Sequence, residues 1–317
     1  MTLDSTTSRP LNSLLVLTNP GSRRAHEVRA TLERSLAQLD SAASVTWIDV
    51  ISDPPKPGAF DRVAIVGGDG SVNLALRWLD RADIRAPVAI IPAGTGNNLA
   101  RGLGIPVAAA DSIALALHST HSRRIDAVRY RLDGDGSGIM LQVAALGMPA
   151  RVAMQFDRLR HQSILRHPIR WLGDSFYRLL ALVAVTKGKS EQQQWQINID
   201  GNDQDGCGSA LFLGNEGTIG GGFHPCPRAS LDDGLLDLCL IPPLTTVEAI
   251  RLFSKISRGK HLEARSDIFY IQCRKVRIQQ SAAPFLVDGD IVGGPQVIEL
   301  EVIPGHLDVI LPEPWIE

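Results

Sequence analysis

The sequence lacks closely spaced cysteines, and this excludes several kinds of protein. Its four cysteines are Cys207, Cys226, Cys239 and Cys273, and no two of them form a CxxC pair. Zinc ribbons and thioredoxin-like redox sites require such pairs, and a disulfide-bonded scaffold requires a far higher cysteine content. We therefore expect four free thiols in a reducing compartment.

Long apolar runs and a large net charge are also missing. No segment approaches the roughly 18 apolar residues of a membrane-spanning helix, and the longest run, residues 179–185, predicts a buried helix. Residues 1–10 are polar, without the basic-then-apolar pattern of a secretion signal. The formal net charge of −2 gives no general attraction to nucleic acid. These features predict a cytoplasmic protein that does not bind nucleic acid.

The first 125 residues alternate between strand and helix patterns, which predicts a Rossmann-like α/β domain with a mostly parallel sheet. Apolar strand-like runs lie at residues 14–18, 45–51, 63–66 and 88–91, and helical periodicity at 23–39 and 72–79. Ligands of such sheets bind beyond the carboxyl ends of the strands. Three glycine-rich loops follow strands, at 19–22, 67–71 and 92–98, and we expect them at one edge of the sheet.

From residue 126 onward the pattern changes to many short strands separated by hairpin turns. One such turn is Asp133-Gly134-Asp135-Gly136, and another is Asp200-Gly201-Asn202-Asp203. Repeated hairpins predict an antiparallel β-sandwich. We therefore divide the chain into an α/β domain at 1–125 and an all-β domain at 126–317, with the last strands as candidates to pack back on the first domain.

The loop Gly67-Gly68-Asp69-Gly70-Ser71 lies between a predicted strand and a predicted helix. A glycine turn that leads into a helix directs backbone N–H groups at a phosphate. This loop has no P-loop lysine. It carries Asp69, whose carboxylate would repel phosphate oxygens unless a divalent cation lay between them. The chemistry predicted is a complex of Mg²⁺ with ATP, and the alternative is a tight turn that binds nothing.

Several segments, in order along the chain, resemble the diacylglycerol kinase catalytic family, which includes the bacterial lipid kinases and the sphingosine kinases. The matching segments are Asn19-Pro20-Gly21-Ser22, Gly67-Gly68-Asp69-Gly70-Ser71-Val72-Asn73, residues 92–101, Gly214-Asn215 with Gly220-Gly221-Gly222, residues 226–237 and Asp288-Gly289-Asp290. The resemblance implies an NAD kinase/phosphofructokinase-like nucleotide domain followed by a β-sandwich. It also implies an ATP- and Mg²⁺-dependent kinase that phosphorylates a hydroxyl of a diacylglycerol-like, phosphatidylglycerol-like or sphingoid lipid.

The resemblance further implies a set of nucleotide-binding residues. They are Asn19, Ser52, Gly67, Gly68, Asp69, Gly70, Ser71, Val72, Asn73, Gly94, Thr95 and Asn97. Backbone N–H groups and the Ser71 hydroxyl would hold phosphates, and Asp69 would position Mg²⁺. For Asn97 and its neighbour Asn98, a helix cap before Leu99 is an equally good interpretation.

Asp290 lies where the family has the glutamate that acts as catalytic base. Aspartate is one methylene shorter, so its carboxylate would lie ~1.5 Å further back, and a displacement of ~1 Å can lower a rate ~100-fold. Either the backbone compensates, a water molecule relays the proton, or the protein is a weak kinase. Without the resemblance, Asp288-Gly289-Asp290 also suits a simple hairpin turn.

A second-domain metal site is implied by the same resemblance, with Asp233 as ligand and the carbonyls of Ser230 and Leu235 beside it. Oxygen ligands of this kind suit Mg²⁺ or Ca²⁺. Asp126 lies where the family has another acidic residue, although a linker aspartate would look the same.

Residues 151–189 are the predicted membrane contact. Six arginines and two lysines alternate there with aromatic and apolar residues, a composition that suits peripheral docking on anionic lipid at the inner face of the membrane. The alternative is a helical pair with a solvated basic face. Two other functions stay open, an NAD kinase and a catalytically weak nucleotide- or lipid-binding regulator. The acceptor lipid and the oligomeric state also stay open.

Overall fold

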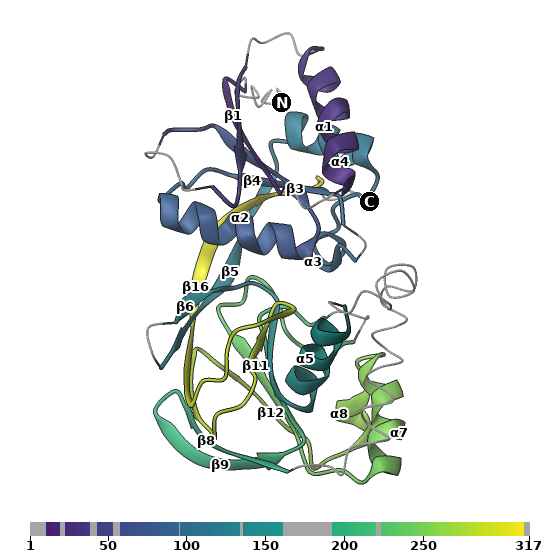
Figure 1. The fold of residues 1–317 in the computed structure, drawn as a ribbon, viewed down its shortest axis with the longest axis vertical. Coiled ribbons are helices and arrows are strands. Elements are labelled where there is room, and N and C mark those ends of the chain that lie inside the picture. The colour runs from purple at the N-terminus through teal and green to yellow at the C-terminus, as the bar shows by residue number, and fades with distance from the viewer. Residues whose placement is uncertain are drawn as a thin grey trace, which may run out of the picture. The chain divides into compact units, whose positions relative to one another are not determined.

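The computed structural model describes residues 11–19, 23–38, 43–52, 58–94, 96–133, 136–160, 192–219 and 223–313 (Figure 1). The chain packs into two compact units. The first consists of Met1–Arg124 with Leu307–Glu317, and the second of Ile125–His306. The division made from sequence differs from this one mainly in Leu307–Glu317, the segment that was a candidate to join the first domain.

The sheet of the first unit is parallel. Its strands lie in the order β2 (Ser44–Asp49), β1 (Ser13–Thr18), β3 (Arg62–Gly67) and β4 (Val88–Pro92). The apolar side chains of β1, β3 and β4 are almost all buried, as expected for parallel strands that are covered on both faces. Val309, in the last strand of the chain, pairs with Val88.

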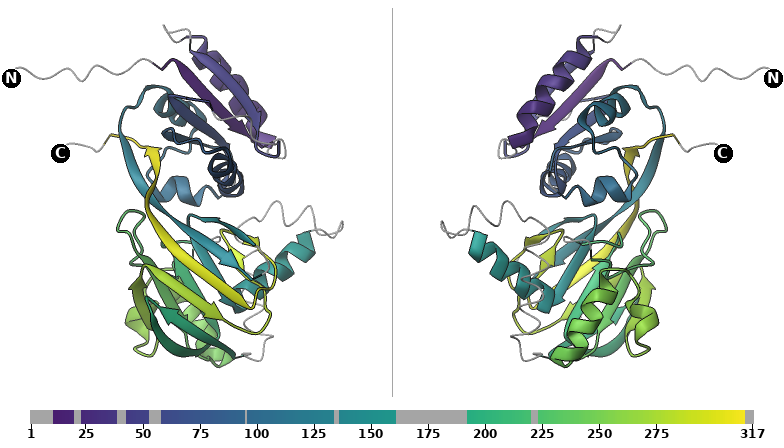
Figure 2. Two further views of the ribbon diagram at one scale, coloured as in Figure 1. Left: turned by 90° about the vertical axis from the view of Figure 1, so that its left-hand side faces the viewer. Right: turned by 90° about the vertical axis from the view of Figure 1, so that its right-hand side faces the viewer.

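Helices cover both faces of this sheet. Side chains of α1 (Arg23–Leu36) and α4 (Ala109–His118) form one core with alternate residues of the strands. α2 (Asp69–Ala82) contacts β1 and β3 and buries most of its apolar side chains, so it covers the opposite face. Figure 2 shows α1 running beside the strands. The short helix α3 (Asn98–Gly102) follows β4.

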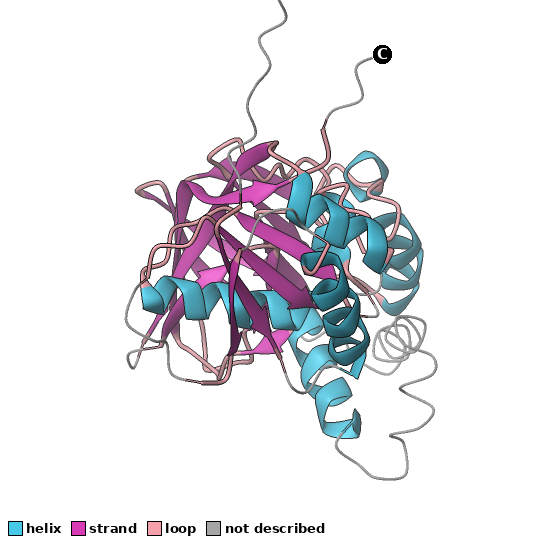
Figure 3. Cartoon of the chain, turned by 90° about the horizontal axis from the view of Figure 1, so that it is seen from above, coloured by secondary structure: helices cyan, strands magenta, loops and turns pink. Residues whose placement is uncertain are grey.

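The second unit contains antiparallel strands in two layers, distinguished from the helices by colour in Figure 3. One layer consists of β16 (Val297–Ile310), β13 (Lys275–Gln279), β8 (Gln193–Ile199) and β9 (Asn202–Gly208). In the same layer β5 (Ser122–Leu132) pairs with β16, and β6 (Ser137–Met140) pairs with β5. The other runs in the order β12 (Phe269–Cys273), β11 (Leu236–Ile241), β10 (Ala210–Gly214), β7 (Val143–Gly147), β14 (Leu286–Val287) and β15 (Asp290–Ile291).

Two apolar cores hold the second unit together. The first lies between the layers and includes Trp195, Leu211, Leu238, Phe285 and Leu300. The second lies on the other face of the β7–β10–β11 layer, where α5 (Met148–Arg160), α7 (Thr246–Ile256) and α8 (His261–Ala264) cover it. A sheet packed on a second sheet is a β-sandwich. The predicted fold class, α/β followed by a β-sandwich, is therefore confirmed.

The predicted membrane segment, residues 151–189, lies mostly outside the described residues. Its described part belongs to α5, which ends at Arg160. None of the described helices is both long enough and apolar enough to span a bilayer.

Candidate functional site

The two glycine-rich loops that follow β3 and β4 lie against one another in the first unit. A Cβ atom on Gly68 would lie 2.8 Å from the Gly94 Cα atom, and one on Gly94 would lie 2.5 Å from the Gly68 Cα atom. The Ala93 N–H donates to the Gly67 carbonyl at 2.9 Å. Only glycine fits where two backbones approach so closely. The predicted convergence of these two loops is therefore present, and it depends on missing side chains.

Asp69 connects the two loops through its carboxylate. One oxygen accepts the Asn98 N–H and the other the Leu99 N–H, both at 3.1 Å. These N–H groups are at the start of α3, where they have no acceptor inside the helix. Asp69 therefore caps a helix that begins 29 residues later in the chain, a role that sequence reasoning missed.

The Asn97 side chain forms two hydrogen bonds within the second loop. Its side chain accepts the Gly94 N–H at 3.0 Å and donates to the Gly94 carbonyl at 3.1 Å. The residue is buried and has a φ of 51°, in the left-handed region. Asn97 precedes α3, but its side chain does not cap that helix. The side chain shapes the loop instead, and a contact with nucleotide stays a prediction.

The N-terminus of α2 carries the N–H groups predicted to bind phosphate. Gly68 is the N-cap and provides no side-chain cap, and the first bond inside the helix runs from the Val72 N–H to the Gly68 carbonyl at 3.0 Å. The N–H groups of the first turn therefore lack acceptors within the helix. Gly70 is exposed, with open space where a Cβ would be. The Asn19 side chain donates to the Ser71 hydroxyl at 3.3 Å, so the first loop meets the second here.

The other predicted nucleotide residues of the first unit have different surroundings. Val72 and Asn73 are buried in α2. Ser52 is exposed, and its carbonyl accepts the Trp78 indole N–H at 2.9 Å. Thr95 and residues 20–22 lie outside the described residues. The nucleotide roles of all of these stay predictions.

In the second unit, Asp288 and Gly289 form a two-residue hairpin turn between β14 and β15. Their φ values are 50° and 92°, and Val287 pairs with Asp290 across the turn. Two positive φ values identify a type I′ turn, for which Asp-Gly is a preferred sequence. The hairpin interpretation is thus correct for the backbone. Asp290 follows the turn and is exposed, and its role as base stays a prediction.

The buried carboxylate of Asp288 holds this hairpin in place. It accepts the N–H groups of Leu141 at 2.8 Å, Gln142 at 2.8 Å and Val143 at 3.1 Å. Three such bonds satisfy the charge of a carboxylate that is only 9% exposed. The exposed Asp290 therefore lies two residues from a firmly anchored one.

A second layer of hydrogen bonds lies behind these N–H groups. The Gln142 carbonyl accepts the N–H groups of Asn215 and Glu216 at 2.8 and 3.1 Å. The Asn215 side chain donates to the carbonyls of Asp126 and Leu141 at 3.0 and 2.8 Å. Burial raises the pKa of the Glu216 carboxyl, although Thr218 donates to it. Sequence reasoning missed Glu216, and its one signal is a carboxylate two residues after the end of the buried strand β10.

The predicted metal residues lie in the loop before β11. Asp233 accepts the Leu235 N–H at 2.9 Å, and the Ser230 hydroxyl donates to Asp232 at 2.8 Å. Burial raises the pKa of the Asp233 carboxyl, and the negative charges of Asp126 and Asp232 raise it further. A bound cation would relieve this repulsion, so the residues fit a cation.

Asp126 shapes the same loop. Its two carboxylate oxygens accept the Gly234 and Gly305 N–H groups, each at 2.7 Å. Among the described residues, no group of three or more His, Cys, Asp and Glu side chains converges as a metal site. A cation beside Asp233 would therefore take carbonyl oxygens and water as further ligands, which suits Mg²⁺ or Ca²⁺. Metal binding by Ser230, Asp233 and Leu235 stays a prediction.

Comparison with known proteins identifies the family. Residues 13–130 match the diacylglycerol kinase catalytic domain, and residues 143–311 match the YegS C-terminal NAD kinase beta sandwich-like domain. A probable lipid kinase YegS-like protein of Pseudomonas aeruginosa is 30% identical over 297 residues, which cover 90% of each chain. The chain belongs to the diacylglycerol kinase catalytic family. It is therefore a lipid kinase, a phosphotransferase with an alcohol group as acceptor, as the sequence predicts.

Other relatives of this lipid kinase agree with the assignment. A diacylglycerol kinase of Mycobacterium tuberculosis is 29% identical over 253 residues, which cover 80% of this chain and 77% of the relative. The crystal structure of a putative diacylglycerol kinase from Bacillus anthracis has a TM-score of 0.74 at 21% identity, and the match covers 98% of this chain and 99% of that one. The second match shows the fold alone.

Proposed function

We propose that this lipid kinase transfers the γ-phosphate of ATP, with Mg²⁺ bound, to a hydroxyl of a diacylglycerol-like, phosphatidylglycerol-like or sphingoid lipid. The observation that carries the proposal is the junction of the two glycine loops at the N-terminus of α2. There, backbone N–H groups without acceptors inside the helix lie beside the Asp69 carboxylate. Gly68 and Gly94 leave no room for a larger side chain at this junction.

On the nucleotide side, the N–H groups of Gly70 and Ser71 would bind phosphate oxygens, with the dipole of α2 in their favour. Asp69 would hold Mg²⁺. Each of its oxygens accepts one N–H and keeps a further lone pair, so capping α3 and binding a cation are compatible. The cation would supply neutralisation of the charge that develops on the phosphates.

On the acceptor side, the Asp290 carboxylate would take the proton of the lipid hydroxyl as that oxygen attacks the γ-phosphorus. The new P–O bond forms while the bond to the β-phosphate oxygen breaks, and ADP leaves. Asp288 and its three N–H donors hold the turn beneath Asp290. A rigid turn cannot swing forward to compensate for the shorter side chain, so we expect a slower chemical step than glutamate would allow.

The test is transfer of phosphate from Mg²⁺-ATP into mixed micelles that contain diacylglycerol, phosphatidylglycerol, ceramide or sphingosine, with NAD as a soluble acceptor. Wild type is compared with Asp290→Asn, Asp290→Glu and Asp69→Asn. We expect Asp290→Asn to lower kcat at least ~100-fold, as loss of a general base does, with little change in KM for ATP. Asp290→Glu should raise kcat, since it restores the missing methylene.

The matched control is Asp205→Asn, an exposed strand aspartate of the same unit, which should keep kcat within about twofold. Equal kcat values for wild type and Asp290→Asn would contradict the proposed base. Transfer of phosphate to NAD alone would support the NAD kinase alternative. The family model that matches the second unit is described as NAD kinase beta sandwich-like. ATP binding without transfer to any acceptor would support the weak regulator, which Asp290 in place of glutamate favours.

A further inference from the structure

Helix α7, on the surface of the second unit (Figure 2), has one face that packs and one that does not. Its inner side chains, Ala249, Leu252, Phe253 and Ile256, contribute to the second apolar core, and the Phe253 ring contacts Phe223 edge-on at 4.6 Å between centroids. The helix is therefore held by its inner face, and its outer face is left to solvent.

Both ends of α7 are fixed by local hydrogen bonds. At the start, Glu248 and Thr245 form a capping box, in which each side chain accepts the other's backbone N–H. At the end, the Lys260 N–H donates to the Lys255 carbonyl at 2.9 Å and the Gly259 N–H to the Ile256 carbonyl at 3.0 Å. Gly259 has a φ of 67°, so these bonds form a Schellman motif. The helix is a preformed element and requires no ordering on binding.

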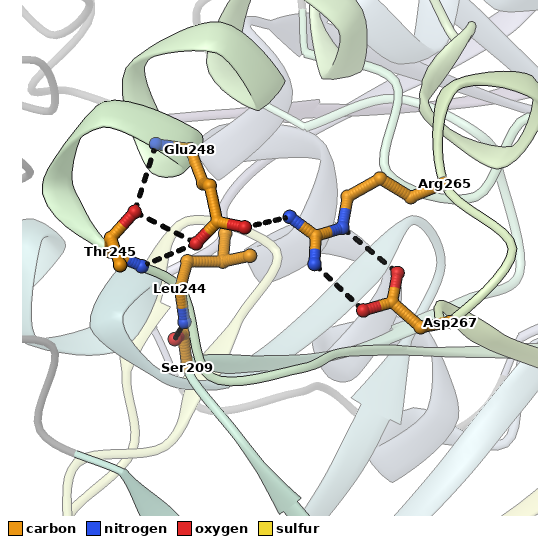
Figure 4. A network of polar contacts seen from close by, with 6 residues as sticks. All are labelled: Ser209, Leu244, Thr245, Glu248, Arg265 and Asp267. Carbon is orange, nitrogen blue, oxygen red and sulfur yellow. Dashed lines mark hydrogen bonds and ion pairs between the residues drawn. The ribbon is translucent and has the colours of Figure 1, made fainter.

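An ion-pair network ties the first turn of α7 to the chain before β12 (Figure 4). Glu248 accepts a bond from Arg265 at 2.9 Å, and Arg265 makes a two-pronged contact with Asp267 at 2.8 and 2.7 Å. Glu248 is therefore already paired with a cation, although the network as a whole keeps one negative charge because Arg265 also pairs with Asp267.

The outer face of α7 combines apolar and basic residues. Val247 and Ile250 are 57% and 40% exposed, and Arg251, Lys255 and Arg258 are exposed as well. Val247, Ile250, Arg251 and Lys255 are at positions i, i+3, i+4 and i+8 of α7 and share one side of it. Arg258 lies in the turn that follows the end of the helix at Ile256. None of these three cations forms a salt bridge with another described residue. Glu263 on α8, an acidic residue outside the network, is exposed.

We propose that this face, formed by Val247, Ile250, Arg251, Lys255 and Arg258, docks on the surface of an anionic lipid bilayer. Single exposed apolar residues are ordinary, but two apolar residues beside three cations that form no salt bridge with another described residue are typical of an interfacial helix. The apolar pair would enter the acyl boundary, and the cations would bind phosphate groups of anionic lipids. The inference rests on the proposed function in one respect, because a lipid acceptor lies in such a bilayer.

The test is flotation of the protein with vesicles of phosphatidylcholine alone or of phosphatidylcholine with about 30% phosphatidylglycerol, which makes the surface strongly anionic. Each cation near such a surface is worth about a fivefold change in affinity. We therefore expect R251E/K255E/R258E to weaken binding to anionic vesicles at least ~100-fold. V247S/I250S should weaken it about tenfold, because less apolar surface is buried.

Each variant has a matched control. R34E/R81E/R274E changes three exposed arginines elsewhere and alters net charge equally. I51S/V107S removes two exposed apolar residues, 71% and 46% exposed, from the first unit. Both controls should bind anionic vesicles with an affinity within about threefold of that of wild type. Any loss of affinity in the arginine control would reflect only the general effect of net charge. Equal losses in R251E/K255E/R258E and R34E/R81E/R274E would overturn the proposal, as would no binding of wild type to anionic vesicles.

A site-specific probe removes the objection that a variant has misfolded. A polarity-sensitive dye on V247C, in a C207S background that removes the exposed native thiol, should shift to shorter wavelength with anionic vesicles and not with phosphatidylcholine. The same dye on V107C should not shift. A shift at both positions, or at neither, would overturn the assignment to α7.

Failure of the docking surface and failure of the proposed kinase reaction are distinguishable. Kinase activity toward a short-chain diacylglycerol in monomeric solution should be equal in wild type and R251E/K255E/R258E, whereas activity toward vesicle-embedded diacylglycerol should fall at least ~100-fold in the variant. Equal activity in both assays would overturn the docking surface alone. Vesicle binding that depends on α7 without transfer to any lipid would overturn the kinase reaction alone.

Discussion

Both units use carboxylates to hold their candidate loops, but the first unit adds a close contact between backbones. In the first unit, the loops after β3 and β4 touch because Gly68 and Gly94 have no side chains. In the second unit, the loops are held by carboxylates that accept backbone N–H groups, three by Asp288 and two by Asp126. Two backbones can approach closely if neither residue has a side chain. A buried carboxylate is stable only if backbone N–H groups donate hydrogen bonds to it.

This difference predicts different vulnerabilities. Adding a methyl group at Gly68 or Gly94 should damage the first unit, because the two loops leave no room for a further atom there. Changing charge or pH should damage the second unit more than the first, because Asp288 and Asp126 together accept five backbone N–H groups and Asp69 accepts two. The four predictions below sharpen or break this comparison, beginning with the largest expected effect.

Asp288→Asn should give the largest loss of stability. Replacing one carboxylate oxygen by an NH₂ group sets a donor against backbone donors, and a buried hydrogen bond to a charged group is worth about 1.5–3 kcal/mol. We expect the free energy of unfolding in urea to fall by about 3 kcal/mol or more. Asp290→Asn, across the same turn but exposed, should lower it by less than about 0.5 kcal/mol. Similar losses in both variants would mean that the Asp288 carboxylate is not what anchors the hairpin.

Gly94→Ala should give the largest loss of nucleotide use in the first unit. Its Cβ atom would lie 2.5 Å from the Gly68 Cα atom, so the loops must separate. A displacement of ~1 Å at a site that depends on positioning can cost ~100-fold, and we expect kcat/KM for ATP to fall by about that factor.

Gly70→Ala is the control for the fold, because a Cβ there meets no atom within 4 Å. An alanine inside a helix should stabilise the protein by about 0.5–1 kcal/mol relative to glycine. If Gly94→Ala kept full kcat/KM for ATP, the contact between the loops would not matter for nucleotide use.

His261 should make the stability of the second unit depend on pH. Its side chain is fully buried, and burial lowers its pKa. As pH falls below about 6.5, the unfolded chain takes up a proton that the folded chain does not, so stability decreases with falling pH. The slope should be at most about 1.4 kcal/mol per pH unit. Urea unfolding between pH 7.5 and 5.5 should show this slope in wild type and lose it in His261→Gln.

Glu248 should make the smallest contribution to the pH dependence of the free energy of unfolding, and at a lower pH than His261. Hydrogen bonds from Thr245, then from Arg265, lower the pKa of this exposed carboxyl to about 2. The folded pKa is depressed, so the contribution of Glu248 is present above the unfolded pKa of 4.5 and disappears as pH falls toward 2. The difference in unfolding free energy between wild type and Glu248→Gln should be constant from pH 7 to 5 and shrink below. A difference that grew as pH fell would contradict the ion pair.

Much of the fold follows from local pattern. The buried apolar runs of β1, β3 and β4 predicted parallel strands, and the capping residues Thr245 and Glu248 suit the start of α7. The chain from Val297 to Ile310 forms one continuous strand, β16, although Pro304 and Gly305 lie within it. Gly305 adopts a φ of 57°, and its N–H bonds to Asp126, so a distant carboxylate keeps the strand together.

For the candidate site residues, too, local sequence predicted one part and the tertiary structure decided the other. The order strand, glycine turn, helix identified the loop at Asp69, and Asp-Gly identified the hairpin at Asp288, because turn chemistry acts over a few residues. The partners of both carboxylates lie far away in the chain: Asn98 is 29 residues from Asp69, and Leu141 is 147 residues from Asp288. Local sequence determines where a turn forms, since backbone conformation depends on neighbouring residues. Which N–H groups a carboxylate accepts depends on segments that meet only when the chain is folded.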